Sequence, residues 1–239
     1  MTANVRILDG FEDPAFGPER WNALVKRSAT NVVFLTWEWQ RAWWEVFGRG
    51  RLLLILAQRE GSGGVLAPLF IDGGMAFLVG SGSSDYLDLI GETEDTELLK
   101  ALLRAALRAE PELVGFRFYH VPETSRTGAQ LRAIADELKL TCVDEGELVA
   151  PALMSSAGTE IRQAADRRRL VRHERFFQRD GALTIHHWQH GDAILRHLPS
   201  FFAQHIRRWE ATCYPSLFLD AAQQSFYRLL ADQAGPAGW

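Results

Sequence analysis

Cysteine is scarce in this chain, and its two thiols, Cys142 and Cys213, lie far apart. They make no metal-ligand spacing, and a reduced cytoplasmic protein is the simplest interpretation. Long apolar runs are missing as well. Nowhere do about 18 apolar residues follow one another, and the N-terminus has no basic segment ahead of an apolar one. We therefore expect neither a membrane span nor a secretion signal.

Neither sign of charge dominates, since 26 basic residues stand against 30 acidic ones and the formal net charge is −4. This balance gives no global attraction to nucleic acid or to an anionic membrane, so the sequence argues against a nucleic-acid partner. The chain has 239 residues, of which 47% are hydrophobic and 23% are charged. That is enough for one large globular domain or two smaller ones.

Four of the eight tryptophans fall in one stretch, FLTWEWQRAWWEVF, at residues 34–47. Helical spacing places the large rings on one side of this stretch and the charged residues on the other, which predicts an amphipathic helix. Aromatic stripes of this kind usually pack into a core, and we expect Trp43 and Phe47 at its centre. A buried indole N–H needs a partner, so we expect Trp37 or Trp39 to border a groove instead.

The order of predicted elements indicates an α/β protein. Three apolar runs joined by glycine-rich turns predict an antiparallel meander, and from about residue 95 the pattern is helix, strand, helix, strand. Strands are expected at 5–8, 51–58, 65–71, 75–80, 86–90, 113–121, 140–153 and 183–189. Helices are expected at 18–28, 37–47, 96–109, 127–139, 155–181, 192–210 and 221–233, with the helix at 192–210 interrupted at Pro199.

The meander ends in VGSGSSDYLDL, which has two glycines whose backbone N–H groups could face an anion. The stretch lacks the third glycine of a dinucleotide fingerprint and the Gly-Lys-Ser/Thr of a P-loop, and it leads into a strand. A tight turn is therefore the simpler interpretation. Asp85, Tyr86 and Asp88 remain candidates for the polar rim of a binding site.

Arginines recur at spacings of four, three and four in the expected helix at 155–181. These spacings align their guanidinium groups in one stripe. The stripe is either a ridge that binds a phosphate-bearing donor, an RNA backbone or an acidic glycan, or a solvated face that pairs with acidic residues. The four candidate anion-binding residues are Arg168, Arg172, Arg175 and Arg179.

His205 is the histidine with the most suggestive neighbours, because Arg208 and Trp209 follow it by three and four residues. On one helix these positions share a face that combines a titratable base, a fixed cation and a flat ring. We predict that His205 acts as a general base or holds an acceptor, with Arg208 as an anion contact. We find no zinc-protease spacing and no nucleophile motif, and we expect no metal site.

Taken in order, FLTWEWQRAWWEVFG, LAPLF, GSGSSDYLDL, RRRLVRHERFFQRDG and HIRRWE resemble the CelD-type, or cellulose-biosynthesis-associated, acetyltransferases of the GNAT superfamily. The resemblance runs from about residue 30 onward. It extends to the Fem-type transferases, which have two GNAT-like halves in tandem. It implies a GNAT-like mixed sheet flanked by helices over residues 1–154, followed by a long basic helix and a partial second GNAT-like half over 155–239.

The resemblance also implies a function, acyl transfer from acetyl-CoA or another acyl-CoA to an amine or hydroxyl on a polysaccharide or related small-molecule acceptor. Trp37, Trp39, Asp85, Tyr86, Arg208 and Trp209 would then contact the acceptor. In GNAT enzymes a glycine-containing loop and a helix N-terminus hold the pyrophosphate of the donor. The matching LIGETEDTELL is acidic and has one glycine, which predicts a poor donor site. The donor would then need a further C-terminal half or a second chain.

Two other functions remain open at this stage. One is a non-catalytic module that binds an anionic partner through the arginine-rich helix. The other is a Fem-like aminoacyl transferase that uses charged tRNA, which rests on fold-level analogy alone.

Overall fold

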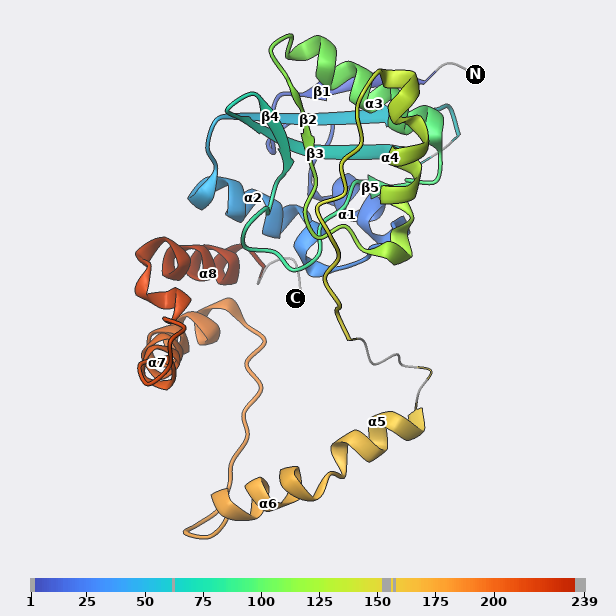
Figure 1. Cartoon of the computed structure of the whole chain (residues 1–239). Helices are drawn as coiled ribbons and strands as arrows, with labels where there is room; N and C mark the ends of the chain where they lie inside the picture. Colours follow the sequence, from blue (N-terminus) through green and yellow to red (C-terminus); the bar gives the residue numbers. More distant parts are fainter. Residues whose placement is uncertain (1–2, 62, 152–155, 157, 235–239) are drawn as a thin grey trace. The chain divides into compact units, whose positions relative to one another are not determined.

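The computed structural model describes residues 3–61, 63–151, 156 and 158–234 (Figure 1). The chain divides into two units. The first comprises Met1–Val143 together with His190–Trp239, and the second comprises Asp144–Gln189.

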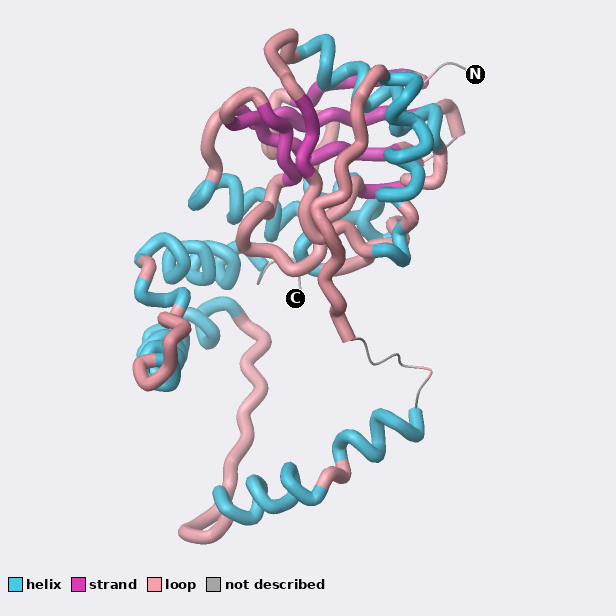
Figure 2. The backbone as a smooth tube through the Cα atoms, viewed as in Figure 1, coloured by secondary structure: helices cyan, strands magenta, loops and turns pink. Residues whose placement is uncertain are grey.

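The first unit is built on a mixed six-stranded sheet, drawn in magenta in Figure 2. Its main path runs in the order β1-β2-β3-β4-β6, with β5 paired to β3. All pairs are antiparallel except β4 with β6, which is parallel. This confirms the predicted α/β class and the predicted meander. The strands are β1 (Asn4–Leu8), β2 (Arg51–Gln58), β3 (Val65–Asp72), β4 (Met75–Leu78), β5 (Ile90–Gly91) and β6 (Gly115–Arg117).

Helices cover both faces of this sheet. Phe70 of β3 faces α2 (Trp37–Phe47), because the Trp43 ring lies 5.5 Å from the Phe70 ring. Residues of β2 and β1 that are in register with Phe70 share its face, and the alternate set, which includes Val5 and Ile7, faces the other way. That second face is covered by α3 (Thr96–Ala109), which contacts β1, β2 and β3. The predicted arrangement of a sheet flanked by helices is therefore confirmed.

The C-terminal helices also belong to the first unit. Helix α8 (Ala221–Ala234) packs against both α2 and α7 (Gly191–Trp209), and its Phe226 ring lies 5.0 Å from that of Trp39. The remaining helices of this unit are α1 (Pro18–Arg27) and α4 (Thr127–Ala135), with single 3₁₀ turns η1 (Val33–Leu35), η2 (Glu123–Ser125), η3 (Asp136–Leu138) and η4 (Leu217–Leu219).

The predicted interruption at Pro199 is wrong, because α7 continues through it. A proline inside a helix removes one backbone hydrogen bond and strains the preceding turn. The flanking residues Leu198 and Phe202 are buried in a small cluster with Phe218. This packing on both sides of the proline favours one continuous helix.

Two predicted strands are also wrong. Residues 140–151 and 183–189 form neither helix nor strand, and the last two residues of the first prediction lie outside the described residues. Apolar side chains in these segments face solvent, with Val149 93% exposed and Ile185 71% exposed. An apolar pattern favours a strand only where a neighbouring strand supplies hydrogen bonds and a covering surface. The strand predicted at 113–121 is shortened to β6, and only Ile90 of the strand predicted at 86–90 lies in β5.

The second unit contains two short helices, α5 (Gly158–Ala165) and α6 (Arg168–Phe177), where one long helix over 155–181 was expected. Arg167 between them has an extended backbone, with φ −58° and ψ 128°. None of the described residues in α5 or α6 is buried. Short helices gain most of their stability from packing an apolar face, so nothing here favours one longer helix over two short ones.

The predicted domain boundary between residues 154 and 155 falls where the structure does not describe the chain, and it stays a prediction. The partial second GNAT-like half also stays a prediction. Among the described residues, no helix is both long enough and apolar enough to cross a lipid bilayer.

Candidate functional site

The candidate site lies where the parallel pair of strands in the described sheet ends. Because β4 and β6 run in the same direction, their carboxyl ends meet at the same edge of the sheet. Ligands of open α/β sheets bind in this position, outside the carboxyl ends of the strands. Two loops leave from it, residues 79–89 after β4 and residues 118–122 after β6.

The two loops are joined through Ser84, whose side chain is buried. The Ser84 carbonyl oxygen lies 2.8 Å from Nδ1 of His120. The Ser84 hydroxyl oxygen accepts a hydrogen bond of 3.0 Å from Nε1 of Trp39. In return, the backbone N–H of Leu87 donates to the carbonyl of His120 at 3.1 Å. Ser84 is therefore held from the sheet edge on one side and from α2 on the other.

His120 has the geometry of a proton acceptor. A carbonyl oxygen only accepts hydrogen bonds, so Nδ1 must carry the hydrogen that bonds Ser84. In the neutral ring, Nε2 then has a lone pair. The His120 side chain is exposed, and its backbone adopts the left-handed conformation with φ 57°. Left-handed conformations of residues other than glycine are sparsely populated and occur often at functional sites.

Asp85 directly follows Ser84 in the chain, and its charge acts on the hydroxyl of Tyr227 in α8. Asp85 is exposed, and Tyr227 of α8 is half-buried. Burial raises the pKa of the Tyr227 hydroxyl, and the negative charge of Asp85 raises it further. The raised pKa keeps the Tyr227 hydroxyl protonated near neutral pH, so this hydroxyl can donate a hydrogen bond.

Three aromatic rings, those of Phe34, Trp39 and Tyr86, pack together at the loop of residues 79–89 and form an aromatic wall there. The Phe34 ring lies 4.8 Å from that of Trp39 and 6.3 Å from that of Tyr86. Trp39 is buried and Tyr86 is half-buried. Trp39 thus lies beside the loop that contains Asp85 and Tyr86. Whether they contact an acceptor stays a prediction.

Trp37 lies apart from this group. Its Nε1 donates to the carbonyl of Phe11 at 3.1 Å, and the guanidinium of Arg41 stacks on its ring at 5.3 Å. Within the same helix, Trp43 is buried as predicted, whereas Phe47 is only half-buried. The prediction that Phe47 lies at the centre of the core is wrong, because Phe47 is the last residue of α2 and is only partly buried at the margin of the core. Its ring lies 5.4 Å from the ring of the buried Phe226.

Asp88 is a buried carboxylate within the loop of residues 79–89, with 1% of its surface exposed. It accepts hydrogen bonds from Thr30 Oγ1 at 2.7 Å and from the backbone N–H of Leu89 at 2.8 Å. Burial raises its pKa above the ordinary value of 3.8, while the hydroxyls of Thr127, Thr30 and Ser125 and the Leu89 amide act in the opposite direction. Asp88 therefore joins separate segments beneath the site and is not part of an exposed rim, contrary to the prediction.

His205 belongs to a second cluster in the C-terminal helices. Its Nδ1 lies 2.8 Å from Ser216 Oγ, and its ring packs against Trp209 at 5.9 Å and Phe218 at 5.0 Å. The predicted proximity of His205 and Trp209 is confirmed, while Arg208 is exposed. Ser216 is buried and caps η4 by accepting from the Phe218 N–H, so its hydroxyl has a structural role. The catalytic role of His205 stays a prediction.

Three of the four predicted anion-binding arginines, Arg168, Arg172 and Arg175, lie on α6 at positions that share one face. Arg179 lies beyond the end of the helix, and its guanidinium stacks on Phe176 at 4.1 Å. The predicted stripe of four on a single helix is therefore wrong in its last member. All four side chains are exposed, and no ion pair to them is found within the described part of the second unit.

The N-terminus of α3, where the resemblance would place the donor pyrophosphate, is occupied by the protein itself. Asp95 caps it by accepting from the backbone N–H groups of Glu97 and Leu98 at 3.0 and 3.2 Å. Arg59 is paired with the same carboxylate at 2.7 Å. These residues do not fit a phosphate group, because a carboxylate already neutralises the donors that a phosphate would need.

Comparison with known proteins adds no assignment to this geometry. No family model matches the chain, and neither the curated proteins nor the solved structures contain a match to it.

His120 and Tyr227 were not singled out by the sequence. His120 lies 36 residues from Ser84, and Tyr227 comes from the last helix. The available signal was the position of His120 at the end of a predicted strand that follows a helix, where a parallel pairing would bring a polar residue to the carboxyl edge. No local pattern marks Tyr227.

Proposed function

We propose that the chain is the acceptor-binding part of a GNAT-like acyltransferase that acts on an amine or hydroxyl of a polysaccharide or related acceptor. The observation that carries this proposal is the exposed His120 with its Nε2 lone pair, at the carboxyl ends of the β4–β6 pair. The mixed sheet and the family resemblance of the sequence support it.

In this function His120 is the general base. An acceptor N–H or O–H would donate its hydrogen to Nε2, and the Ser84 carbonyl would stabilise the imidazolium through the Nδ1–H bond. Asp85 and the Tyr227 hydroxyl would orient polar groups of the acceptor, and the aromatic wall would contact its apolar face. No step is assigned to the donor, because the N-terminus of α3 does not fit its pyrophosphate.

Acceptor-dependent thiol release tests the proposal. The donor is a small thioester, S-acetyl-N-acetylcysteamine at millimolar concentration, because it has no pyrophosphate that the chain must bind. The acceptors are a panel of amino sugars and cello-oligosaccharides. His120→Gln should lower the rate by about 10²–10⁴-fold. His173→Gln is the matched control, because His173 is an exposed histidine in α6 and should leave the rate unchanged. Activity that survives His120→Gln, or the absence of acceptor-dependent release with the whole panel, would contradict the proposal.

The same assay decides the role predicted for His205. If His205 is the base, His205→Gln should produce the large loss and His120→Gln should not. Ser216→Ala separates a catalytic effect from a structural one, because it removes the partner of Nδ1 while the imidazole remains.

A second candidate function rests on a different observation, the exposed arginines of α6 that have no ion pair among the described residues of their unit. They support a module that binds an anionic partner. Arginine forks suit phosphate and sulfate groups, and binding to a polyanion weakens steeply with salt. Heparin titrations at two salt concentrations test this, with Arg172→Glu and Arg175→Glu expected to abolish binding. Unchanged affinity in both variants would exclude the module. The tRNA-dependent alternative rests on the resemblance alone.

A further inference from the structure

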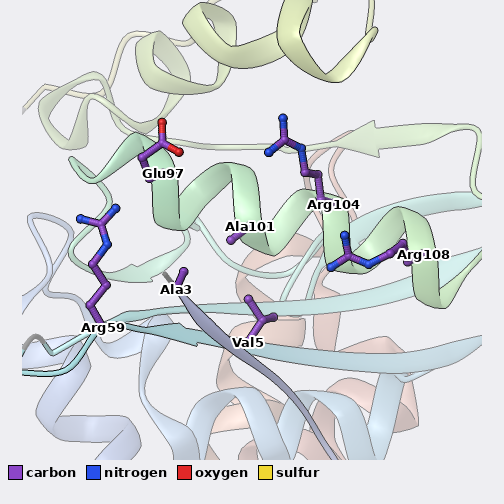
Figure 3. Close-up of a pocket in the computed structure, with 7 residues that line it drawn as sticks. All are labelled: Ala3, Val5, Arg59, Glu97, Ala101, Arg104 and Arg108. Carbon is purple, nitrogen blue, oxygen red and sulfur yellow. The ribbon is translucent and has the colours of Figure 1, made fainter. Parts of the chain in front are cut away.

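A basic groove runs between β1, at the edge of the sheet, and α3 (Figure 3). Its main cavity has a volume of about 510 Å³ and is lined by Val5, Ala101 and three arginines. A second cavity of about 300 Å³ shares Val5 and Arg108 with the first and continues along β1 to Ile7. None of the lining residues belongs to the candidate site described above.

The floor of the groove is apolar and open. Val5 and Ile7 lie on the α3 face of β1, and Ile7 is 46% exposed. On the helix, Ala101, Ala105 and Ala109 recur every four residues beside them. Because alanine side chains are short, α3 leaves space above β1 where larger residues would fill it.

The rim of the groove has unbalanced positive charge. Arg59 is paired with Asp95, and Glu97, the single acidic residue of the lining, is paired with Lys100. Hydrogen bonding to Lys100 lowers the pKa of Glu97, and the charge of Arg104 contributes to this shift. Arg104 and Arg108 are exposed and make no ion pair within the residues that the structure describes. Figure 3 shows both arginines on the same helix as Glu97 and Ala101.

The outer edge of strand β1 adds backbone hydrogen-bonding groups beside this groove. In the described sheet β1 pairs only with β2, so the backbone groups along its other edge have no strand partner. An exposed strand edge is a template on which another extended segment can form main-chain hydrogen bonds. Side chains of such a segment would alternate, and every second one would enter the groove.

We propose that the groove binds an extended acidic peptide segment of a partner protein, which adds to β1 as a further strand and places carboxylates against Arg104 and Arg108. The opposite charges determine this choice of occupant. A second copy of the chain paired through β1 would instead bring the arginines of both copies together, and like charges at an interface are unfavourable. The proposal does not depend on the function proposed for His120.

Hydrogen exchange measured with a designed peptide tests the proposal. The probe is Ac-SVEVEVES-NH2, and its matched control is Ac-SVKVKVKS-NH2, which has the same strand propensity and the opposite charge. We expect the glutamate peptide to slow exchange of the β1 amides, and the lysine peptide to leave them unchanged. Protection by both peptides alike, or by neither at millimolar concentration, would overturn the proposal. Protection by inorganic phosphate alone would also overturn it, in favour of a small-anion site.

Charge-reversal variants test whether the arginines at the rim of the groove contribute to peptide binding. The double variant Arg104→Glu/Arg108→Glu should weaken peptide binding at least about tenfold, because it replaces attraction by repulsion at two positions. Arg20→Glu/Lys26→Glu makes the same change of charge on α1 and should leave the affinity within about twofold. All four side chains are exposed, so the variants should fold, which circular dichroism would verify. Equal affinities of the two double variants would contradict a role for the rim.

Discussion

At the scale of single residues, the backbone conformation of His120 determines the geometry of the candidate site. Its left-handed backbone costs about 1–3 kcal/mol, and such a conformation persists only where the surroundings hold it. Here the holding contacts are the Ser84 carbonyl on the ring and the Leu87 N–H on the backbone. The strained loop thereby fixes the direction of the imidazole.

The buried indoles lead to the first prediction. Trp43 is 3% exposed, and its Nε1 has no hydrogen-bond partner among the residues that the structure describes, whereas Nε1 of Trp39 donates to Ser84. Trp43→Ala should lower the free energy of unfolding by about 3–5 kcal/mol, because it leaves a large cavity. Trp39→Phe should cost about 1–3 kcal/mol through its lost hydrogen bond, and more than Trp43→Phe, which removes an unsatisfied donor.

Urea denaturation of the three variants measures these differences. A loss below about 1 kcal/mol for Trp43→Ala would contradict its place in the core.

Asp88 leads to a prediction about pH. Its pKa is raised in the folded protein, mainly by burial, so the folded state binds a proton more tightly than the unfolded state. The resulting contribution to stability is full below the ordinary pKa of 3.8 and is lost as the pH rises through the raised value. Asp88→Asn should therefore flatten this part of the stability profile, because the amide keeps the bonds to Thr30 and Leu89 without a charge to desolvate.

Unfolding free energies of both proteins at several pH values between about 4 and 8 test this prediction. Asp13 has the opposite effect on the pH dependence of stability, because its pKa is lowered in the folded protein. Desolvation opposes the shift, but the N–H groups of Asp9 and Ala15 and the charge of Arg6 lower its pKa. Its contribution is present in both proteins and cancels in the difference. Parallel profiles would show that Asp88 does not titrate across this range.

At the scale of elements, the N-terminus of α3 is the feature that determines how tightly we expect this chain to bind an acyl-CoA donor. Asp95 occupies the backbone donors there, and Glu94 and Glu97 are its acidic neighbours in the sequence. We expect acetyl-CoA to bind this chain weakly or not at all. Calorimetry at millimolar ligand checks the expectation, and saturable micromolar binding would contradict it.

Asp95→Ala is the informative variant for this helix. It should cost about 0.5–2 kcal/mol of stability, because it removes the cap. If Asp95 is what blocks phosphate, the variant should also bind acetyl-CoA more tightly than the unaltered chain. Asp72→Ala removes a carboxylate from an ion pair with Arg49 outside α3 and should change neither quantity appreciably.

At the scale of the whole molecule, the two units differ in how much they bury. The first unit contains the sheet and an extensive apolar core, whereas in the second no described residue is buried. Amide exchange should therefore be slowest in β2 and β3 and fast throughout α5 and α6, because short helices without buried contacts open at little cost. Mass spectrometry of exchanged peptides measures this, and strong protection of α6 would contradict it.

Local patterns were sufficient for the meander and for the long amphipathic helices. Apolar runs and the turn residues between them indicate where β2, β3 and β4 begin and end, and the apolar stripe of α3 is present in its own 14 residues. The same patterns failed at 140–151 and 183–189. Whether a segment with strand propensity becomes a strand depends on a neighbouring strand that the local sequence does not contain.

The candidate site depends on contacts between distant segments. Sequence spacing suggested Trp39, Asp85 and Tyr86, because these residues lie in or beside marked motifs. His120 joins them only because β6 pairs in parallel with β4, and Tyr227 only because α8 packs on α2. Periodicity reports which face of an element is buried, but not which element covers it. The partners of Ser84, which are 45 and 36 residues away, were therefore decided by tertiary packing alone.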